Sequence, residues 1–165
     1  MKNRWIALYV ENEVGVLAKV SGLFSGKSYN LQSLTVGTTE HEDVSRMTIS
    51  VQADDVTFEQ IKKQLNSMVE VIKVMDLTDV PIHSKEILYA KIHGIDAAGK
   101  EEAFRIAQVF KIRVIDIGED SVLLESALTE RRNNELIALL KKTYRHIEVV
   151  RGGAVAIESI STSCR

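Results

Sequence analysis

The two halves of this chain are expected to contain the same order of strands and helices, and this repeat limits the possible folds more than any single motif does. In the first half, alternation of apolar side chains predicts strands, and apolar spacing of three and four residues predicts amphipathic helices. The predicted strands are 6–10, 31–36, 44–51 and 69–77, and the predicted helices begin near residues 16 and 55. The order is therefore strand–helix–strand–strand–helix–strand (βαββαβ). Asp54 and Asp55 are typical helix-start residues for the second helix, and Thr57 and Gln60 have the spacing of a capping box.

The second half repeats this order. Its predicted strands are 87–93, 112–117, 122–128 and 147–150, and its predicted helices lie near 103–110 and 129–144. Gly152 and Gly153 are expected to end the last of these strands and to precede another apolar strand at 154–160. Pro81, the only proline, lies between the halves. We therefore expect a first domain at 1–78, a linker at 79–84 and a second domain at 85–165.

A βαββαβ unit forms an antiparallel sheet with both helices on one face, so the expected fold class is α+β with two ferredoxin-like domains. The other face of each sheet is left without helices. Pairing with another copy of the chain, edge to edge or face to face, would cover that surface. The pattern therefore favours an oligomer.

Charge and cysteine content argue against several classes of protein. The chain has 21 Lys and Arg against 23 Asp and Glu, so its formal net charge of −2 lacks the basic excess typical of a non-specific nucleic-acid binder. No apolar run reaches the ~20 residues of a membrane-spanning helix, and Glu11 ends the apolar run 5–10 too early for a signal peptide. The single cysteine, Cys164, cannot form an internal disulfide, which favours a reducing, cytoplasmic location.

Motifs for catalysis and metal binding are absent from the sequence. It has no glycine-rich phosphate loop and no nucleophile elbow, and its four histidines lack the spacing of a zinc site. The acidic residues around His41 are metal ligands in principle, but a solvated turn explains them better. Cys164 has no rigid base beside it and is not expected to act as a nucleophile. We therefore expect no catalytic residue, no metal and no cofactor on this chain.

The junction between the first strand and the first helix is the strongest candidate for a binding site. Free backbone N–H groups at a helix N-terminus carry partial positive charge, and Gly15 allows a ligand to approach the backbone closely. Asn12 offers a donor and an acceptor, so the junction has groups for the carboxylate and ammonium of an amino acid. A capped turn without a ligand is the alternative, and spacing alone favours that alternative.

Asn30 adds weight to the amino-acid interpretation. It opens the second strand, where it either terminates the preceding helix or supplies a second polar amide. Asn12 and Asn30 are expected at opposite ends of that helix in one chain. Pairing of two copies would bring the Asn12 loop of one chain near Asn30 of the other, which places a ligand site at a dimer interface.

An ordered set of short motifs in the first half resembles the small regulatory subunit of acetohydroxyacid synthase (acetolactate synthase), which opens with an amino-acid-binding ACT domain. These motifs are Glu11–Leu17, Gly22–Ser25, Tyr29–Leu31, Ser33–Val36 and Ser45–Ile49. The second half is similar more loosely, at Lys85–Ile87, Val109–Phe110, Ile115–Ile117 and Val150–Gly153.

This resemblance implies a protein without an active site that binds a large catalytic subunit. The partner carries thiamine diphosphate, magnesium and FAD, and it condenses pyruvate with a second 2-keto acid in branched-chain amino-acid biosynthesis. The small subunit raises the partner's activity and confers feedback inhibition, usually by valine. The resemblance also implies a homodimer through the ACT domains, with the effector between them.

The effector-binding residues that the resemblance implies lie in the first loop and the second strand. Asn12, Gly15 and Asn30 match the family's effector contacts, and Val14, Val16 and Leu17 would supply backbone amides and apolar contacts.

Three other functions are weighed against this one. A free-standing tandem ACT-domain sensor, or a regulator of another enzyme or of transcription, would share the fold and the Asn/Gly loop but not the later motifs. An RNA-recognition domain has the same element order but needs aromatic residues on its central strands, and 44–51 contains none. A stand-alone enzyme would need a nucleophile–base pair or a metal cluster, neither of which the sequence offers.

Overall fold

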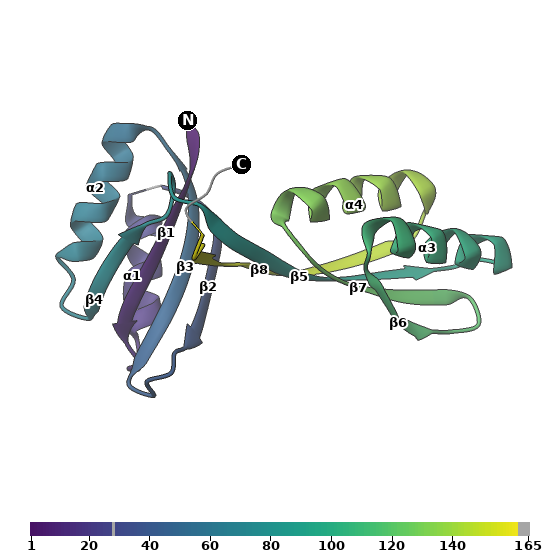
Figure 1. Ribbon diagram of the computed structural model, residues 1–165, viewed down its shortest axis with the longest axis horizontal. Coiled ribbons are helices and arrows are strands. Elements are labelled where there is room, and N and C mark those ends of the chain that lie inside the picture. Colours follow the sequence, from purple (N-terminus) through teal and green to yellow (C-terminus); the bar gives the residue numbers. More distant parts are fainter. Residues whose placement is uncertain (28, 162–165) are drawn as a thin grey trace. The chain divides into compact units, whose positions relative to one another are not determined.

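The computed structural model of the chain describes residues 1–27 and 29–161. It contains two compact units, one formed by Met1–His83 together with the C-terminal segment that begins at Ala154, and the other by Ser84–Gly153 (Figure 1). Each unit has one four-stranded antiparallel sheet and the order βαββαβ, which confirms the α+β fold class. Cys164 and its expected lack of a disulfide lie outside the described residues.

The first unit has the strand order β2-β3-β1-β4 in its sheet. Its elements are β1 (Lys2–Glu11), α1 (Val16–Gly26), β2 (Asn30–Thr38), β3 (Val44–Ala53), α2 (Asp55–Asn66) and β4 (Val71–Asp76). Alternate residues of the two central strands are fully buried against both helices, which is the cause of the period-two pattern in the sequence. The strands contribute Ile6, Leu8, Val10, Met47 and Ile49, and the helices contribute Val20, Phe24, Ile61 and Leu65.

The start of α2 differs from the expected capping box. Asp54 is the N-cap residue, with an extended backbone (φ −77°, ψ 174°), and its carboxylate accepts a hydrogen bond of 2.7 Å from the backbone N–H of Thr57. Thr57 is therefore the donor in this cap and not the capping residue, so the prediction of a Thr57–Gln60 box is wrong. An aspartate at the preceding strand end satisfies the first free N–H groups and leaves no role for a second cap.

The helix-free face of the first sheet is covered in part by the chain's own C-terminal segment. The hydroxyl of Thr35 donates to the carbonyl of Ala154 (2.9 Å), and the backbone N–H of Ala154 donates to the hydroxyl of Ser33 (3.1 Å). Ala156 is buried on this face against Ala7 and Leu77. The segment from Ala154 onward thus packs with the first unit, although the sequence pattern placed it at the end of a second domain at 85–165.

The second unit has the strand order β6-β7-β5-β8. Its elements are β5 (Ile82–His93), α3 (Ala97–Phe110), β6 (Arg113–Ile117), β7 (Ser121–Leu128), α4 (Glu130–Thr143) and β8 (Ile147–Glu158). Strand β8 continues through Gly152 and Gly153, where two strands were expected. The backbone of Gly153 has φ +79°, a left-handed value that glycine adopts at little cost in free energy. The strand therefore continues through this residue.

A polar network lies inside the second unit. The guanidinium of Arg151 on β8 forms two parallel hydrogen bonds of 2.8 Å with the carboxylate of Glu86 on β5. Asn133 on α4 donates to the same carboxylate (3.0 Å) and accepts from Ser126 on β7 (2.6 Å). The Glu86 side chain is only 5% exposed and that of Arg151 is 34% exposed. The network joins strands β5, β7 and β8 to helix α4.

The charge of Glu86 is maintained by these hydrogen bonds. Burial opposes ionisation, but the hydrogen bonds from Arg151 and Asn133 outweigh it and hold the pKa of the Glu86 carboxyl below its ordinary value. The same ion pair raises the pKa of Arg151 above its ordinary value, because the hydrogen bond to Glu86 favours the protonated guanidinium. Loss of either partner would leave a desolvated charge without compensation.

We predict that Arg151→Ala lowers the free energy of unfolding by about 3 kcal/mol, because it leaves the buried Glu86 carboxylate unpaired. The matched control is Arg131→Ala, which removes an exposed partner of Glu135 and should cost less than about 0.5 kcal/mol. Urea denaturation followed by far-ultraviolet circular dichroism measures both values. Equal costs for the two variants would contradict a stabilising role for the network.

The lowered pKa of Glu86 predicts a specific response to acid. Its contribution to stability is complete above the carboxyl's ordinary pKa of 4.5 and is lost as the pH falls through the lower folded-state value. Glu86→Gln should therefore be less stable than the parent chain at pH 7, and the difference in their free energies of unfolding should narrow as the pH falls below 4.5. Urea titrations at several pH values test this, and a gap independent of pH would refute the assignment.

Candidate functional site

The junction between β1 and α1 is a helix start without a side-chain cap. Gly15 is the N-cap residue and has a left-handed backbone (φ +89°, ψ −11°), which glycine adopts at little cost. The other three helices are capped by the side chains of Asp54, Asp96 and Thr129. No heavy atom lies within 4 Å of a Cβ placed on Gly15, so this side of the junction is open. The first-turn amides of α1 are thus accessible to a small anion.

Asn12 fixes this junction to the turn between β2 and β3. Its backbone N–H donates to the carbonyl of Asp43 (2.8 Å), and its side-chain amide donates to the carbonyl of Glu42 (2.8 Å). Its side-chain oxygen accepts from the hydroxyl of Ser45 (2.9 Å). One amide hydrogen and one oxygen lone pair of Asn12 are left for a ligand. The motif Ser45–Ile49 was recognised in the sequence, but its part in holding Asn12 was not.

A pocket of about 190 Å³ lies beside Asn12, on the face of the sheet that packs against the helices. Of the predicted effector residues, Asn12, Val16 and Leu17 line it; they are joined by Val10, Glu11, Glu13, Val36, Ser45 and Met47. The side chain of Val16 is buried in the core, so its contribution to a ligand is restricted to its backbone. Leu17 and Val36 are each 44% exposed, and Val14 is fully exposed. This group of unburied apolar side chains surrounds a polar junction.

Asn30 lies far from this pocket in one copy of the chain. It is exposed at the start of β2, opposite Gln52 of β3, whereas Asn12 contacts Ser45 near the other end of β3. Seven residues of strand separate Gln52 from Ser45, which corresponds to about 24 Å. The structure therefore brings Asn12, Val16 and Leu17 together and leaves Asn30 at the opposite end of the sheet.

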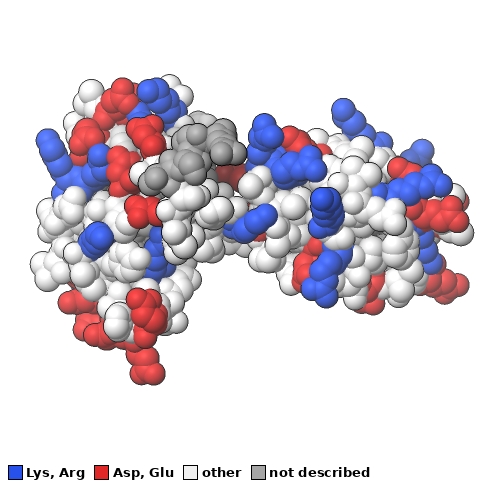
Figure 2. All heavy atoms as spheres, in the orientation of Figure 1, with Lys and Arg blue, Asp and Glu red and all other residues white. Residues whose placement is uncertain are grey.

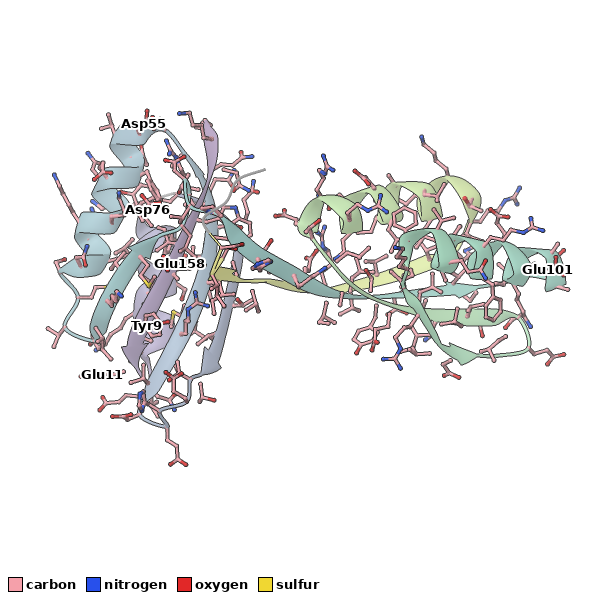
Figure 3. All side chains as sticks on the ribbon, viewed as in Figure 1. Tyr9, Glu11, Asp55, Asp76, Glu101 and Glu158 are labelled. Atoms are coloured by element: carbon pink, nitrogen blue, oxygen red, sulfur yellow. The ribbon has the colours of Figure 1, made fainter. Side chains whose placement is uncertain are left out.

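Acidic side chains surround the junction. The carboxylate of Glu70 pairs with Lys19, one turn into α1, and their hydrogen bond lowers the pKa of Glu70 and raises that of Lys19. Glu11 and Glu13 are exposed at the junction. Figure 2 shows acidic side chains gathered at this end of the first unit, where Figure 3 labels Glu11. A bound ammonium group would be favoured by this potential.

The described part of the chain has neither a metal-binding cluster nor a membrane-spanning helix. Within residues 1–27 and 29–161, no three His, Cys, Asp or Glu side chains are grouped to hold a metal ion. Among the helices described there, none is long and apolar enough to cross a membrane.

Family models match both units. Residues 6–73 match the ACT domain of acetohydroxyacid synthase small subunits, and residues 85–160 match the small subunit of acetolactate synthase. The first match covers β1 through most of β4, including the Asn12–Gly15 junction and Asn30. The first unit is therefore an ACT domain, and the two matches follow one another along the chain in the order that the resemblance implied.

Related proteins match over nearly the whole chain. An acetolactate synthase small subunit of Aquifex aeolicus is 39% identical over 92% of this chain and 79% of the relative. A probable small subunit of Archaeoglobus fulgidus is 40% identical over 92% and 94% of the two chains. The crystal structure of the small subunit from Thermotoga maritima superposes with a TM-score of 0.87, at 30% identity over 98% and 99% of the two chains. The chain belongs to the family of acetolactate synthase small subunits.

Proposed function

We propose that this chain is the regulatory subunit of acetolactate synthase in branched-chain amino-acid biosynthesis. It binds the catalytic large subunit, raises its activity and makes it sensitive to an amino-acid effector, for which valine is the first choice. Membership of the small-subunit family supports the partner and the regulatory role. The chemistry of the β1–α1 junction supports the amino-acid effector.

The incompleteness of the site in one copy is the observation that carries the dimeric part of this proposal. Asn12 and Asn30 are about 24 Å apart along the sheet, so they cannot hold one small molecule within a single chain. A pair of ACT domains related by twofold symmetry presents the same surface twice, and it places the Asn12 junction of one copy against the Asn30 end of the other. Each dimer then has two equivalent effector sites, and the protein acts as a homodimer.

The groups at the junction match the parts of valine. The carboxylate is held by the uncapped amides at the start of α1, close to Gly15. The ammonium contacts the side-chain oxygens of Asn12 and of the second copy's Asn30 in an acidic environment. The isopropyl group packs on Leu17 and Val36, and the partial exposure of these two side chains in one copy supports this contact.

Catalysis belongs to the partner in this proposal. Thiamine diphosphate, magnesium and FAD reside on the large subunit, and this chain holds no cofactor and contributes no catalytic residue. The location of the assembly is the cytoplasm, where the synthase uses its keto-acid substrates.

Regulation follows from linkage between two sites. Valine binds at the interface of two ACT domains, so it stabilises the arrangement of the dimer in which the two half-sites fit together. The catalytic subunit is affected when it prefers a different arrangement, and each ligand changes the affinity of the other by the same factor. Activation and inhibition are therefore separable, because only inhibition requires an intact effector site.

We predict that Asn12→Ala and Gly15→Asp each abolish inhibition by valine and leave activation of the large subunit largely intact. Asn12→Ala removes the tie to Ser45 and a ligand contact, and Gly15→Asp adds a negative charge where the carboxylate binds. The valine concentration for half-inhibition should rise at least roughly tenfold in assays of acetolactate formation. The matched control, Asn66→Ala on the exposed end of α2, should behave as the parent chain does.

Two results would contradict different parts of the proposal. Full valine sensitivity in both junction variants would show that the effector site is elsewhere. Failure of the parent chain to bind or activate the large subunit would instead contradict the regulatory-subunit role. Turnover measured with valine, leucine and isoleucine in parallel identifies the effector.

A mixing experiment tests whether the effector site spans two copies. Asn12→Ala chains and Asn30→Ala chains are each expected to be insensitive to valine. When they are unfolded and refolded together, roughly half of the dimers contain one of each, and every mixed dimer has one site with both asparagines. Partial inhibition should return in the mixture. If both residues acted within one copy, the mixture would stay as insensitive as its components.

A further inference from the structure

A second cavity lies on the helix-free face of the first unit's sheet, on the side opposite to the effector pocket. Its volume is about 310 Å³, which lies at the small end of the range for ligand pockets. Tyr9 and Arg46 of β1 and β3 form its floor, and Val155 and Ile157 of the C-terminal segment form one wall. Tyr9 is labelled in Figure 3. The cavity exists because the segment covers only part of this face.

Arg46 is the unusual feature of this cavity. One terminal guanidinium nitrogen donates to the carbonyl of Ala156 (2.6 Å), and the group lies 5.7 Å from the centre of the Tyr9 ring. Its Nε is buried and makes no hydrogen bond to any described residue. The buried Arg4 also has an Nε without a hydrogen bond, but Arg4 pairs with Asp55, whereas within residues 1–27 and 29–161 no carboxylate lies within 4 Å of the half-buried Arg46. A half-buried guanidinium without a carboxylate partner favours an anionic ligand.

Gly37 opens the space beside this guanidinium. It is the register partner of Arg46 on β2, so a side chain at position 37 would point to the same face. No heavy atom lies within 4 Å of a Cβ placed there, and its backbone is not left-handed. The space is therefore free of protein atoms and next to an unpaired charge.

The other residues that line the cavity determine which kind of ligand fits beside Arg46. Val155 and Ile157 are more than half exposed and apolar, and Tyr9 presents an aromatic face. Glu40 is the one carboxylate that lines the cavity; its side chain is 82% exposed and lies 3.9 Å from His41. Four threonines, Thr35, Thr38, Thr39 and Thr48, complete the lining. The cavity thus combines a single cation with apolar side chains and hydroxyl groups, which suits a short aliphatic chain that ends in a carboxylate.

We propose that this cavity is a second small-molecule site, which binds a short aliphatic monocarboxylate through the guanidinium of Arg46. The carboxylate accepts hydrogen bonds from the terminal nitrogens of Arg46 in the planar, two-point geometry typical of arginine, because Nε is buried and out of reach of the cavity. The aliphatic part lies against Val155 and Ile157. The only carboxylate of the lining, Glu40, is largely exposed to solvent, so the cation of Arg46 distinguishes this site from the acidic β1–α1 junction.

The test is calorimetric titration of the full chain with 3-methylbutanoate and with its neutral amide, 3-methylbutanamide. The acid should bind saturably at one site per chain with a Kd on the order of 1 mM, and the amide should bind at least roughly tenfold more weakly. Arg46→Gln removes the charge, and Gly37→Val fills the cavity without touching the charge. Each should weaken binding of the acid by roughly tenfold or more.

Two control variants make this result specific. Lys73→Gln removes an exposed cation from the same sheet face, and Asn12→Ala alters the effector junction; neither should change binding of the acid. Absence of saturable binding in the parent chain would overturn the proposal, as would equal binding by the parent, Arg46→Gln and Gly37→Val. Loss of binding in Asn12→Ala with retention in Arg46→Gln would assign the acid to the effector junction instead. A negative result with 3-methylbutanoate does not bear on the valine experiments, because those depend on Asn12, Gly15 and Asn30.

Discussion

Two helices can bury only one face of a four-stranded sheet, and the organisation of the first unit follows from how its other face is covered. The chain returns from the second unit and lays Ala154–Glu158 on this face, held by the hydroxyls of Ser33 and Thr35 and by Arg46. Small residues at the contact, Ala7 and Ala156, allow the close approach. The C-terminal segment covers only part of this face, and a cavity that contains the guanidinium of Arg46 lies beside the segment.

At the β1–α1 junction, by contrast, the backbone N–H groups that begin α1 have no side-chain cap. The loop that carries them is nevertheless fixed in position. Asn12 uses three hydrogen bonds to fix the loop on the β2–β3 turn, and Gly15 starts the helix without a side chain over its amides. The donors are therefore held in place before a ligand arrives, so little ordering entropy is lost on binding. A side-chain cap of the kind found on the other three helices would occupy the same donors.

The sequence predicted the elements well because each half has its own apolar periodicity, as in Ile6, Leu8 and Val10. It also located Asn12 and Gly15, since a glycine after a strand and before a helix is visible as a local pattern. Sequence patterns did not predict the contacts whose two residues are far apart along the chain. Neither the Asn12–Ser45 bond nor the docking of Ala154 on Ser33 and Thr35 leaves a local signal, and the buried Glu86–Arg151 pair spans 65 residues. The α2 cap was ambiguous for a different reason, because Asp54, Asp55 and Thr57 all have side chains that can cap a helix.

Strand β3 connects the two sites that we assign to the first unit. Ser45 and Arg46 are consecutive, and consecutive side chains of a strand point to opposite faces. Ser45 thus holds the effector junction on the helix side, while Arg46 holds the C-terminal segment on the other side. The two sites therefore share a strand but no polar side chain, because the polar contacts of the junction come from Asn12 and Ser45 and that of the cavity comes from Arg46. Loss of a polar contact on one face thus leaves the polar contacts on the other face in place.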